Sequence, residues 1–87
     1  MSWKIIFTKT AQKDAKKIKR AGLKTQVENI LKIIKENPYQ NPPSFEKLVG
    51  DLKGAYSRRI TIQNRIVYQV LVEEKIVKVI RMWTHYE

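Results

Sequence analysis

The sequence predicts an α+β fold: an N-terminal strand and an antiparallel helical hairpin, then a three-strand antiparallel meander, with both helices packed on one face of the sheet. Three observations lead to this prediction. The chain opens on a short β-branched and aromatic run, apolar residues then recur at helical spacing, and three strand-like runs follow a proline-rich loop. Its 87 residues predict a single domain over residues 1–87, because either half would be too small to hold a core.

The N-terminal half begins with a predicted strand over residues 2–8, SWKIIFT. Thr8 then offers a side-chain oxygen to the free amides of a helix that runs from Lys9 to about Ala21. Gly22 is predicted to cap the C-terminal end of this helix. Its core-facing stripe is narrow and consists of Ala11, Ala15 and Ile18.

A second helix is predicted from about Leu23 to about Glu36, because apolar residues recur there at i, i+4, i+7, i+8 and i+11. These core-facing residues are Leu23, Val27, Ile30, Leu31 and Ile34. Pro38 disfavours helical geometry at Asn37 and so ends the helix. Because the connection between them is short, the two helices should form an antiparallel hairpin.

The C-terminal half is predicted to be a loop over residues 38–44, a short ordered stretch over 46–48, a turn over 50–54 and then three strands. The strands are Ala55–Thr61, Arg65–Val72 and Lys75–Thr84, with a tight hairpin at Glu73-Glu74 between the last two. The middle strand has two faces of mixed character, one with Ile66, Tyr68, Val70 and Val72, the other with Arg65, Val67, Gln69 and Leu71. This pattern suits a central strand with helices on one face and a concave functional surface on the other.

Charge is the strongest signal in the composition. Eighteen Lys and Arg against eight Asp and Glu give a net charge of +10, which favours a polyanionic partner such as nucleic acid, a ribosome or an acidic protein. The alternative is that the lysines only confer solubility. The basic residues of the first helix are Lys9, Lys13, Lys16, Lys17, Lys19 and Arg20.

The absence of cysteine excludes disulfides, thiolate metal sites and a cysteine nucleophile, and it fits a reducing cytoplasm. No signal peptide or membrane span is recognisable, so we expect a cytoplasmic protein without a membrane partner. A metal-dependent nuclease is disfavoured because the chain has one histidine and its two aspartates, Asp14 and Asp51, lie far apart. We therefore expect neither a metal nor another cofactor.

Three arginines flank the turn between the first two strands of the meander. Arg58 and Arg59 precede this turn and Arg65 follows it, so a hairpin would bring Arg59 and Arg65 close together across the ladder. Adjacent guanidinium groups repel, and a phosphate between them would explain the pair, since guanidinium binds phosphate through two parallel bonds. The alternative is a solvated edge with the arginines pointing into water.

The tail carries the only histidine, His85, close to Trp83 and next to Tyr86. These aromatic residues could simply close a small core, and we assign Trp83 to packing. RNA cleavage without a metal needs a base for the 2′-hydroxyl, a cation for the phosphoryl oxygens and an acid for the 5′-oxygen. Glu46 can be the base, Arg65 and Arg59 the cations, and His85 the acid, with a 2′,3′-cyclic phosphate as the product.

Several segments together resemble the YoeB/Txe toxins of bacterial type II toxin–antitoxin modules, within the wider RelE group. The segments are FEKL at residues 45–48, DLKGAYSRRI at 51–60, NRIVY at 64–68 and HY at 85–86. The resemblance extends over almost the whole chain. Two departures stand out: Glu87 follows the His-Tyr pair that often ends the family chains, and RMWT precedes His85 in place of a run rich in Arg and Tyr.

The resemblance implies a ribosome-dependent mRNA endonuclease that enters the A site, cuts without a metal and is silenced by an acidic antitoxin of YefM/Axe type. It implies that Glu46 is the general base, His85 the general acid and Arg65 the transition-state stabiliser. Arg59 would contact phosphate, as would Arg58, and Tyr86 would position or stack on the scissile nucleotide. The lysines that would meet ribosomal RNA backbone are Lys13, Lys16 and Lys17. A small sheet on a helical hairpin and a homodimer are also implied.

Two rival functions remain open from the sequence. One is a toxin of ParE type, which shares the fold but poisons DNA gyrase and cuts no RNA. The other is a non-catalytic RNA-binding module, in which Tyr56, Trp83 and Tyr86 stack on bases while arginines hold the backbone.

Overall fold

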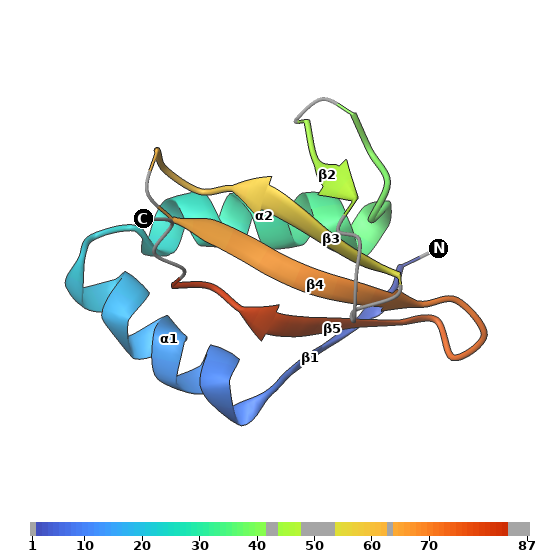
Figure 1. The fold of residues 1–87 in the computed structure, drawn as a ribbon, viewed down its shortest axis with the longest axis horizontal. Coiled ribbons are helices and arrows are strands. Elements are labelled where there is room, and N and C mark those ends of the chain that lie inside the picture. Colours follow the sequence, from blue (N-terminus) through green and yellow to red (C-terminus); the bar gives the residue numbers. More distant parts are fainter. Residues whose placement is uncertain (1, 42–43, 48–53, 63, 84–87) are drawn as a thin grey trace.

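The computed structural model of the chain describes residues 2–41, 44–47, 54–62 and 64–83. A strand, two helices and four further strands follow one another, which confirms the α+β order (Figure 1). In chain order these elements are β1 (Lys4–Phe7), α1 (Lys9–Arg20), α2 (Lys24–Glu36), β2 (Glu46–Lys47), β3 (Ala55–Arg59), β4 (Arg65–Leu71) and β5 (Ile76–Arg81). Most predicted elements are present and one to three residues shorter at their ends, as is usual for boundaries read from a sequence.

The sheet is larger than the predicted meander. Its strand order is β1-β5-β4-β3-β2, and the antiparallel pairing of β3, β4 and β5 confirms the meander. The N-terminal strand β1 adds to the sheet by pairing parallel with β5, and the short stretch at Glu46–Lys47 adds as an antiparallel edge strand beside β3. The sheet is therefore mixed and five-stranded, and β4 lies at its centre as expected.

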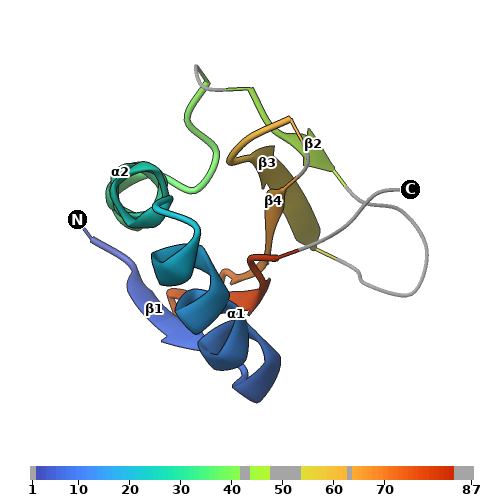
Figure 2. The same ribbon diagram turned by 90° about the vertical axis from the view of Figure 1, so that its left-hand side faces the viewer.

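The hydrophobic core lies between the two helices and one face of the sheet. Figure 2 shows α2 end-on with α1 below it. Directly opposed residues point to the same face, so the register puts Tyr68 of β4 with Val79 of β5 and Val70 with Val77, all facing the core. The buried core residues are Ala11, Ile18, Val27, Ile34, Ile66, Tyr68, Val70, Val77, Val79 and Met82.

Helix α1 begins as predicted but faces the core differently. Thr8 is the N-cap, and its Oγ1 accepts a hydrogen bond from the Ala11 N–H at 3.1 Å. Gly22 follows the helix with a φ of +74°, a conformation that glycine adopts without strain. The predicted stripe was wrong at Ala15, which is exposed, whereas Asp14 is buried between Ala11 and Ile18.

Helix α2 buries the face that its apolar spacing predicts. Val27 and Ile34 are buried, and the other three predicted positions, Leu23, Ile30 and Leu31, pack half-buried against the core. The helix ends at Glu36, and Asn37 is extended, as the following proline requires.

The hairpin between β4 and β5 is longer than the predicted two residues. Leu71 pairs with Ile76, so the turn takes four residues, 72–75, and Lys75 within it has a φ of +56°. Farther along, Val67 pairs with Arg81 and Tyr68 with Val79, which leaves Ile80 as an extra residue in β5. This irregularity is a β-bulge and bends the strand near its C-terminal end.

No helix among the described residues is long and apolar enough to cross a membrane. The predicted turn over residues 50–54 lies outside the described residues apart from Gly54, which has a φ of +72°.

Candidate functional site

Three neighbouring strands bring polar side chains together on the sheet face that points away from the helices. Glu46 of β2 lies directly opposite Ser57 of β3, and Arg59 of β3 lies directly opposite Arg65 of β4. Ser57 and Arg59 are two positions apart on one strand, so all four residues share a face. The structure thus brings together Glu46, Arg59 and Arg65, which were all predicted to belong to one site.

The Arg65 guanidinium is the centre of this group. Its NH1 lies 3.1 Å from Oε2 of Glu46 and donates a hydrogen bond of 3.4 Å to Oγ of Ser57. The Arg65 side chain is 20% exposed and that of Glu46 is 69% exposed. Arg65 is therefore held against the sheet, whereas the Glu46 carboxylate remains open to a ligand.

Ser57 is a member of the site that the sequence interpretation missed. It is buried, and its hydroxyl accepts from Arg65, so it fixes the direction of a cation that would otherwise be a flexible side chain. The register contains the signal, because Ser57 is diagonal to Arg65 across the β3–β4 pair. Because side chains of a strand alternate between its two faces, the sequence alone already places Ser57 on the same face as Arg59.

A hollow of about 180 Å³ opens beside these side chains. Its lining residues are Ser44, Phe45, Glu46, Ser57, Arg59 and Arg65. Two guanidinium groups next to one carboxylate can bind an anion and accept a proton within the same small space. Within the described part of the chain, the Arg59 side chain is exposed and makes no hydrogen bond or ion pair, which leaves its donors available.

Arg58 does not belong to this hollow, contrary to the prediction that it contacts phosphate. It is 1% exposed and points to the helix side of the sheet, because successive residues of a strand alternate between faces. Its Nε donates to the Tyr68 hydroxyl at 2.9 Å, and its NH2 donates to the carbonyls of Pro38 at 3.1 Å and Gln40 at 2.9 Å. Its guanidinium also lies 4.8 Å from the centre of the Phe45 ring.

Arg58 therefore fastens the loop that leads from α2 to Glu46. Tyr68 takes part in the same network and donates its hydroxyl proton to the Pro38 carbonyl at 2.9 Å. Burial raises the pKa of the Tyr68 hydroxyl, and the neighbouring Arg58 guanidinium offsets part of this rise. Burial likewise raises the pKa of Tyr39, whose ring meets that of Tyr56 edge to face.

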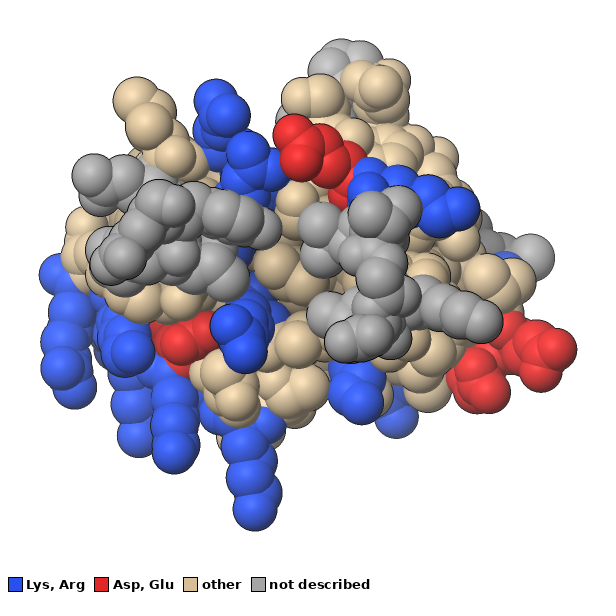
Figure 3. Space-filling view, viewed as in Figure 1, with Lys and Arg blue, Asp and Glu red and all other residues tan. Residues whose placement is uncertain are grey.

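The predicted RNA-backbone lysines lie on another part of the molecule. Lys13, Lys16 and Lys17 are exposed on α1, while the hollow is lined by β2, β3, β4 and the residues before β2. Figure 3 shows Lys and Arg gathered over the α1 side of the molecule and acidic residues over the β4–β5 turn. The charge distribution gives the protein a strongly basic side that can approach a polyanion.

Comparison with known proteins decides the family. A family model for the YoeB-like toxin of bacterial type II toxin–antitoxin systems matches residues 7–86. The chain belongs to this family. No curated protein sequence matches it significantly.

Solved structures agree with the family model. The YoeB/ParE toxin from Agrobacterium tumefaciens matches with a TM-score of 0.85 and 29% identity, over 95% of this chain and 99% of that one. A chain of the YoeB–YefM complex from Staphylococcus aureus matches with a TM-score of 0.80 and 29% identity, over 99% of this chain and 100% of that one. The YoeB dimer from the same organism gives 0.80 and 28%, over 99% and 100%. This YoeB-like toxin thus shares its fold with these proteins over nearly its whole length.

The predicted proton donor and stacking ring, His85 and Tyr86, lie outside the described residues, as do Glu87 and Thr84. The structure describes the two residues, Met82 and Trp83, that come shortly before them in the sequence. Trp83 is half-buried and packs against the core, which agrees with its assignment to packing. Oδ2 of Asp14 accepts hydrogen bonds from the backbone N–H groups of Met82 at 3.1 Å and Trp83 at 3.2 Å.

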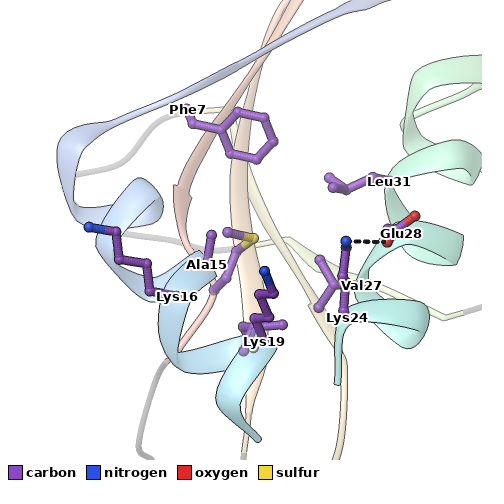
Figure 4. A pocket seen from close by; sticks show the side chains of 10 residues that line it. Phe7, Ala15, Lys16, Lys19, Lys24, Val27, Glu28 and Leu31 are labelled. Carbon is purple, nitrogen blue, oxygen red and sulfur yellow. Dashed lines mark ion pairs between the residues drawn. The ribbon is translucent and has the colours of Figure 1, made fainter. Parts of the chain in front are cut away.

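A second hollow of the YoeB-like toxin lies between α1 and α2 and has a volume of about 340 Å³ (Figure 4). Phe7, Val27 and Leu31 form its apolar floor, and Lys16 and Lys19 stand at its rim. Glu28, the acidic side chain among its described lining residues, is ion-paired with Lys24 at 4.0 Å. This hollow suits the binding of an apolar surface and offers little for acid–base chemistry.

Across the described residues, no group of three or more His, Cys, Asp or Glu side chains is placed to hold a metal ion.

Proposed function

We propose that this YoeB-like toxin is a ribosome-dependent endoribonuclease that cuts mRNA in the A site by metal-free acid–base catalysis. The observation that carries the proposal is the contact between Glu46 and Arg65, 3.1 Å apart, with Arg59 beside them in one hollow. A base and two cations are the groups that 2′-hydroxyl attack on a phosphodiester requires. The third requirement, a proton donor, is assigned to His85 from its place in the sequence.

In the free protein Glu46 and Arg65 neutralise each other. A scissile phosphate between Arg59 and Arg65 would compete for the guanidinium, because guanidinium binds phosphate through two parallel hydrogen bonds. The Glu46 carboxylate, 69% exposed, would then turn to the 2′-hydroxyl that precedes the phosphate. Ser57 would keep Arg65 in place during this exchange.

The reaction then proceeds in one displacement. Glu46 takes the proton of the 2′-hydroxyl while its oxygen attacks phosphorus, and Arg65 and Arg59 stabilise the charge that grows on the phosphoryl oxygens. His85 in its protonated form gives a proton to the departing 5′-oxygen. The products are a 2′,3′-cyclic phosphate and a 5′-hydroxyl. Tyr86 positions the nucleotide or stacks on it.

The basic side of the molecule would make contact with the ribosome in the cytoplasm. Lys13, Lys16 and Lys17 are exposed on α1, where they can meet ribosomal RNA backbone through charge. Such contacts carry no sequence information and weaken as salt rises. Choice of the cut site would then come from the ribosome and from the hollow around Arg65.

An acidic antitoxin would be the partner that silences the toxin. YoeB from Staphylococcus aureus forms a complex with YefM and also a dimer, and we propose both kinds of assembly for this chain. The apolar hollow between α1 and α2, with Lys16 and Lys19 at its rim, suits an amphipathic acidic segment of the antitoxin. A segment of this kind would fold onto the toxin as it binds.

The experiment that tests the proposal is cleavage of a translated message on purified ribosomes, read by primer extension. We expect cuts in register with codons in the presence of wild type. Glu46→Gln should lower the rate by about 10²–10⁴-fold, because the amide cannot accept the proton. Glu74→Gln makes the same chemical change on the exposed β4–β5 turn and should cut like wild type.

Two outcomes would favour other functions. Inhibition of DNA gyrase without any RNA cut would identify a ParE-like toxin. Ribosome binding without cuts by wild type would identify a non-catalytic RNA-binding module.

A further inference from the structure

Asp14 is a buried acid on a helix whose other charged residues are all basic. Its side chain faces inwards between Ala11 and Ile18, and the residue is 5% exposed. Burying a carboxylate is unfavourable unless hydrogen bonds compensate, so a position that only filled the core would be expected to hold an apolar residue. The groups that Asp14 binds should therefore account for its burial.

The carboxylate binds the backbone of a segment 68 and 69 residues away. Oδ2 of Asp14 accepts from the Met82 N–H at 3.1 Å and from the Trp83 N–H at 3.2 Å. Hydrogen bonds with an ionised acceptor are about twice as strong as neutral ones. Two consecutive amides on one oxygen also fix the direction of the chain at that point.

These hydrogen bonds lie immediately after the last residue of β5 that pairs within the sheet. The last paired residue of β5 is Arg81, and the bulge at Ile80 has already bent the strand. Thr8, the N-cap of α1, donates from Oγ1 to the Ile80 carbonyl at 2.8 Å. Thr8 thus binds β5 within the sheet, whereas Asp14 binds the two residues that follow the strand.

We propose that Asp14 is the positioning residue for the proton donor of the toxin. The inference rests on the proposed ribonuclease activity and on His85 as the acid. Asp14 holds the amide of Trp83, two residues before His85 in the sequence, so it fixes the backbone at the last described residue before the proposed donor. Asp14 itself does not touch the substrate and acts through the backbone.

An mRNA whose leaving group needs no proton can show whether Asp14 positions the acid or only stabilises the fold. The substrate is a ribosome-bound mRNA in which sulfur replaces the bridging 5′-oxygen at the scissile linkage, and its cleavage is compared with that of the all-oxygen mRNA. Thiolate leaves without protonation, so a defect in the acid should vanish on the sulfur substrate. His85→Ala should lose about 10²–10⁴-fold on the oxygen substrate and regain most of this on sulfur.

Asp14→Ala should show the same pattern with a smaller loss, about 10–10²-fold on oxygen and close to none on sulfur. Asp14→Asn keeps the shape and one acceptor oxygen without the charge, and should lie between Asp14→Ala and wild type. Thr8→Val is the matched control, because it removes the cap of α1 and the bond to Ile80 but keeps the bonds to Met82 and Trp83. It should lower Tm and leave the ratio of oxygen to sulfur rates at the wild-type value.

An equal loss on both substrates for folded Asp14→Ala would overturn the proposal and leave Asp14 as a stabilising contact only. If Asp14→Ala does not fold, Asp14→Asn decides: an unchanged rate ratio contradicts positioning, and a ratio shifted several-fold towards sulfur supports it. His85→Ala without rescue on sulfur would remove the acid and the inference with it. Failure of the proposed function is a separate result, since wild type would then cut neither substrate.

Discussion

Arg58 and Arg59 are neighbours in the sequence, and the structure gives them opposite tasks. We predict that Arg58→Met destabilises the fold strongly, while Arg59→Met leaves stability unchanged and impairs cleavage. Arg58 donates to Tyr68, Pro38 and Gln40 while buried at 1% exposure. Methionine fills a similar volume but donates nothing, so three oxygen acceptors lose a charged donor.

The magnitude follows from these contacts. Removal of one partner from a buried charged network costs about 3–5 kcal/mol, and an unpaired buried acceptor alone costs about 1–3 kcal/mol. We expect a loss of about 3 kcal/mol or more, which lowers Tm by roughly 12–24 °C in a chain of this length. Arg59→Met is a surface change and should stay within about 0.5 kcal/mol of wild type.

Urea unfolding monitored by circular dichroism measures both stabilities, and the ribosome cleavage assay measures both activities. Arg59→Met should lose about 10²–10³-fold in rate, as expected when one charge-stabilising donor is removed. The assignment of Arg58 would be refuted if the two variants had equal stability.

Three further predictions test other parts of the molecule. Ser57→Ala should lower the cleavage rate by about tenfold with little change in ribosome affinity, because Arg65 loses the hydroxyl that orients it; equal rates would remove Ser57 from the site. Tyr68→Phe should be less stable than wild type by an amount that is constant below pH 10 and shrinks above it. The pKa of Tyr68 is raised on folding, so the contribution of this hydroxyl to the stability of wild type is lost as pH rises through that pKa, and Tyr68→Phe has no such contribution to lose. A stability difference that does not shrink in alkaline unfolding experiments would contradict the burial of this hydroxyl. Lys19→Glu should weaken antitoxin binding about fivefold in calorimetry, whereas Lys32→Glu, an exposed position outside the apolar hollow, should have a smaller effect; equal effects would argue against this hollow as the docking surface.

Much of the fold could be predicted because local patterns determine it. The apolar spacing of α2, the N-cap at Thr8 and the stop at Asn37 each depend on residues close in sequence, and all three are confirmed. The parallel pairing of β1 with β5 joins the two ends of the chain, as in the register of Lys4 with Ile76. No local pattern specifies such a partner, so the N-terminal strand could be predicted but its place in the sheet, and with it the mixed sheet, could not.

The site was predicted in part. Motif and chemistry together identified Glu46, Arg59 and Arg65, which the structure places in one hollow. Arg58 was placed there as well, although the period of two along a strand puts it on the face opposite to Arg59. Strict use of that period would have predicted the burial of Arg58.

Asp14 could not be found from the sequence. Spacing of i, i+4 and i+7 pointed to Ala15, and a carboxylate on a basic helix is normally expected to face water. Its burial depends on two backbone amides at the far end of the chain, after a bulge in β5 that nothing in the sequence announces. Only the folded structure brings these groups together.

The most direct test of the proposed function is the chemistry of the RNA ends made by the purified toxin on programmed ribosomes. Attack by the 2′-hydroxyl, with Glu46 as base and His85 as acid, predicts a 2′,3′-cyclic phosphate on the upstream fragment and a 5′-hydroxyl on the downstream one. A 3′-hydroxyl with a 5′-phosphate would mean that water or another nucleophile attacks, and would contradict the mechanism.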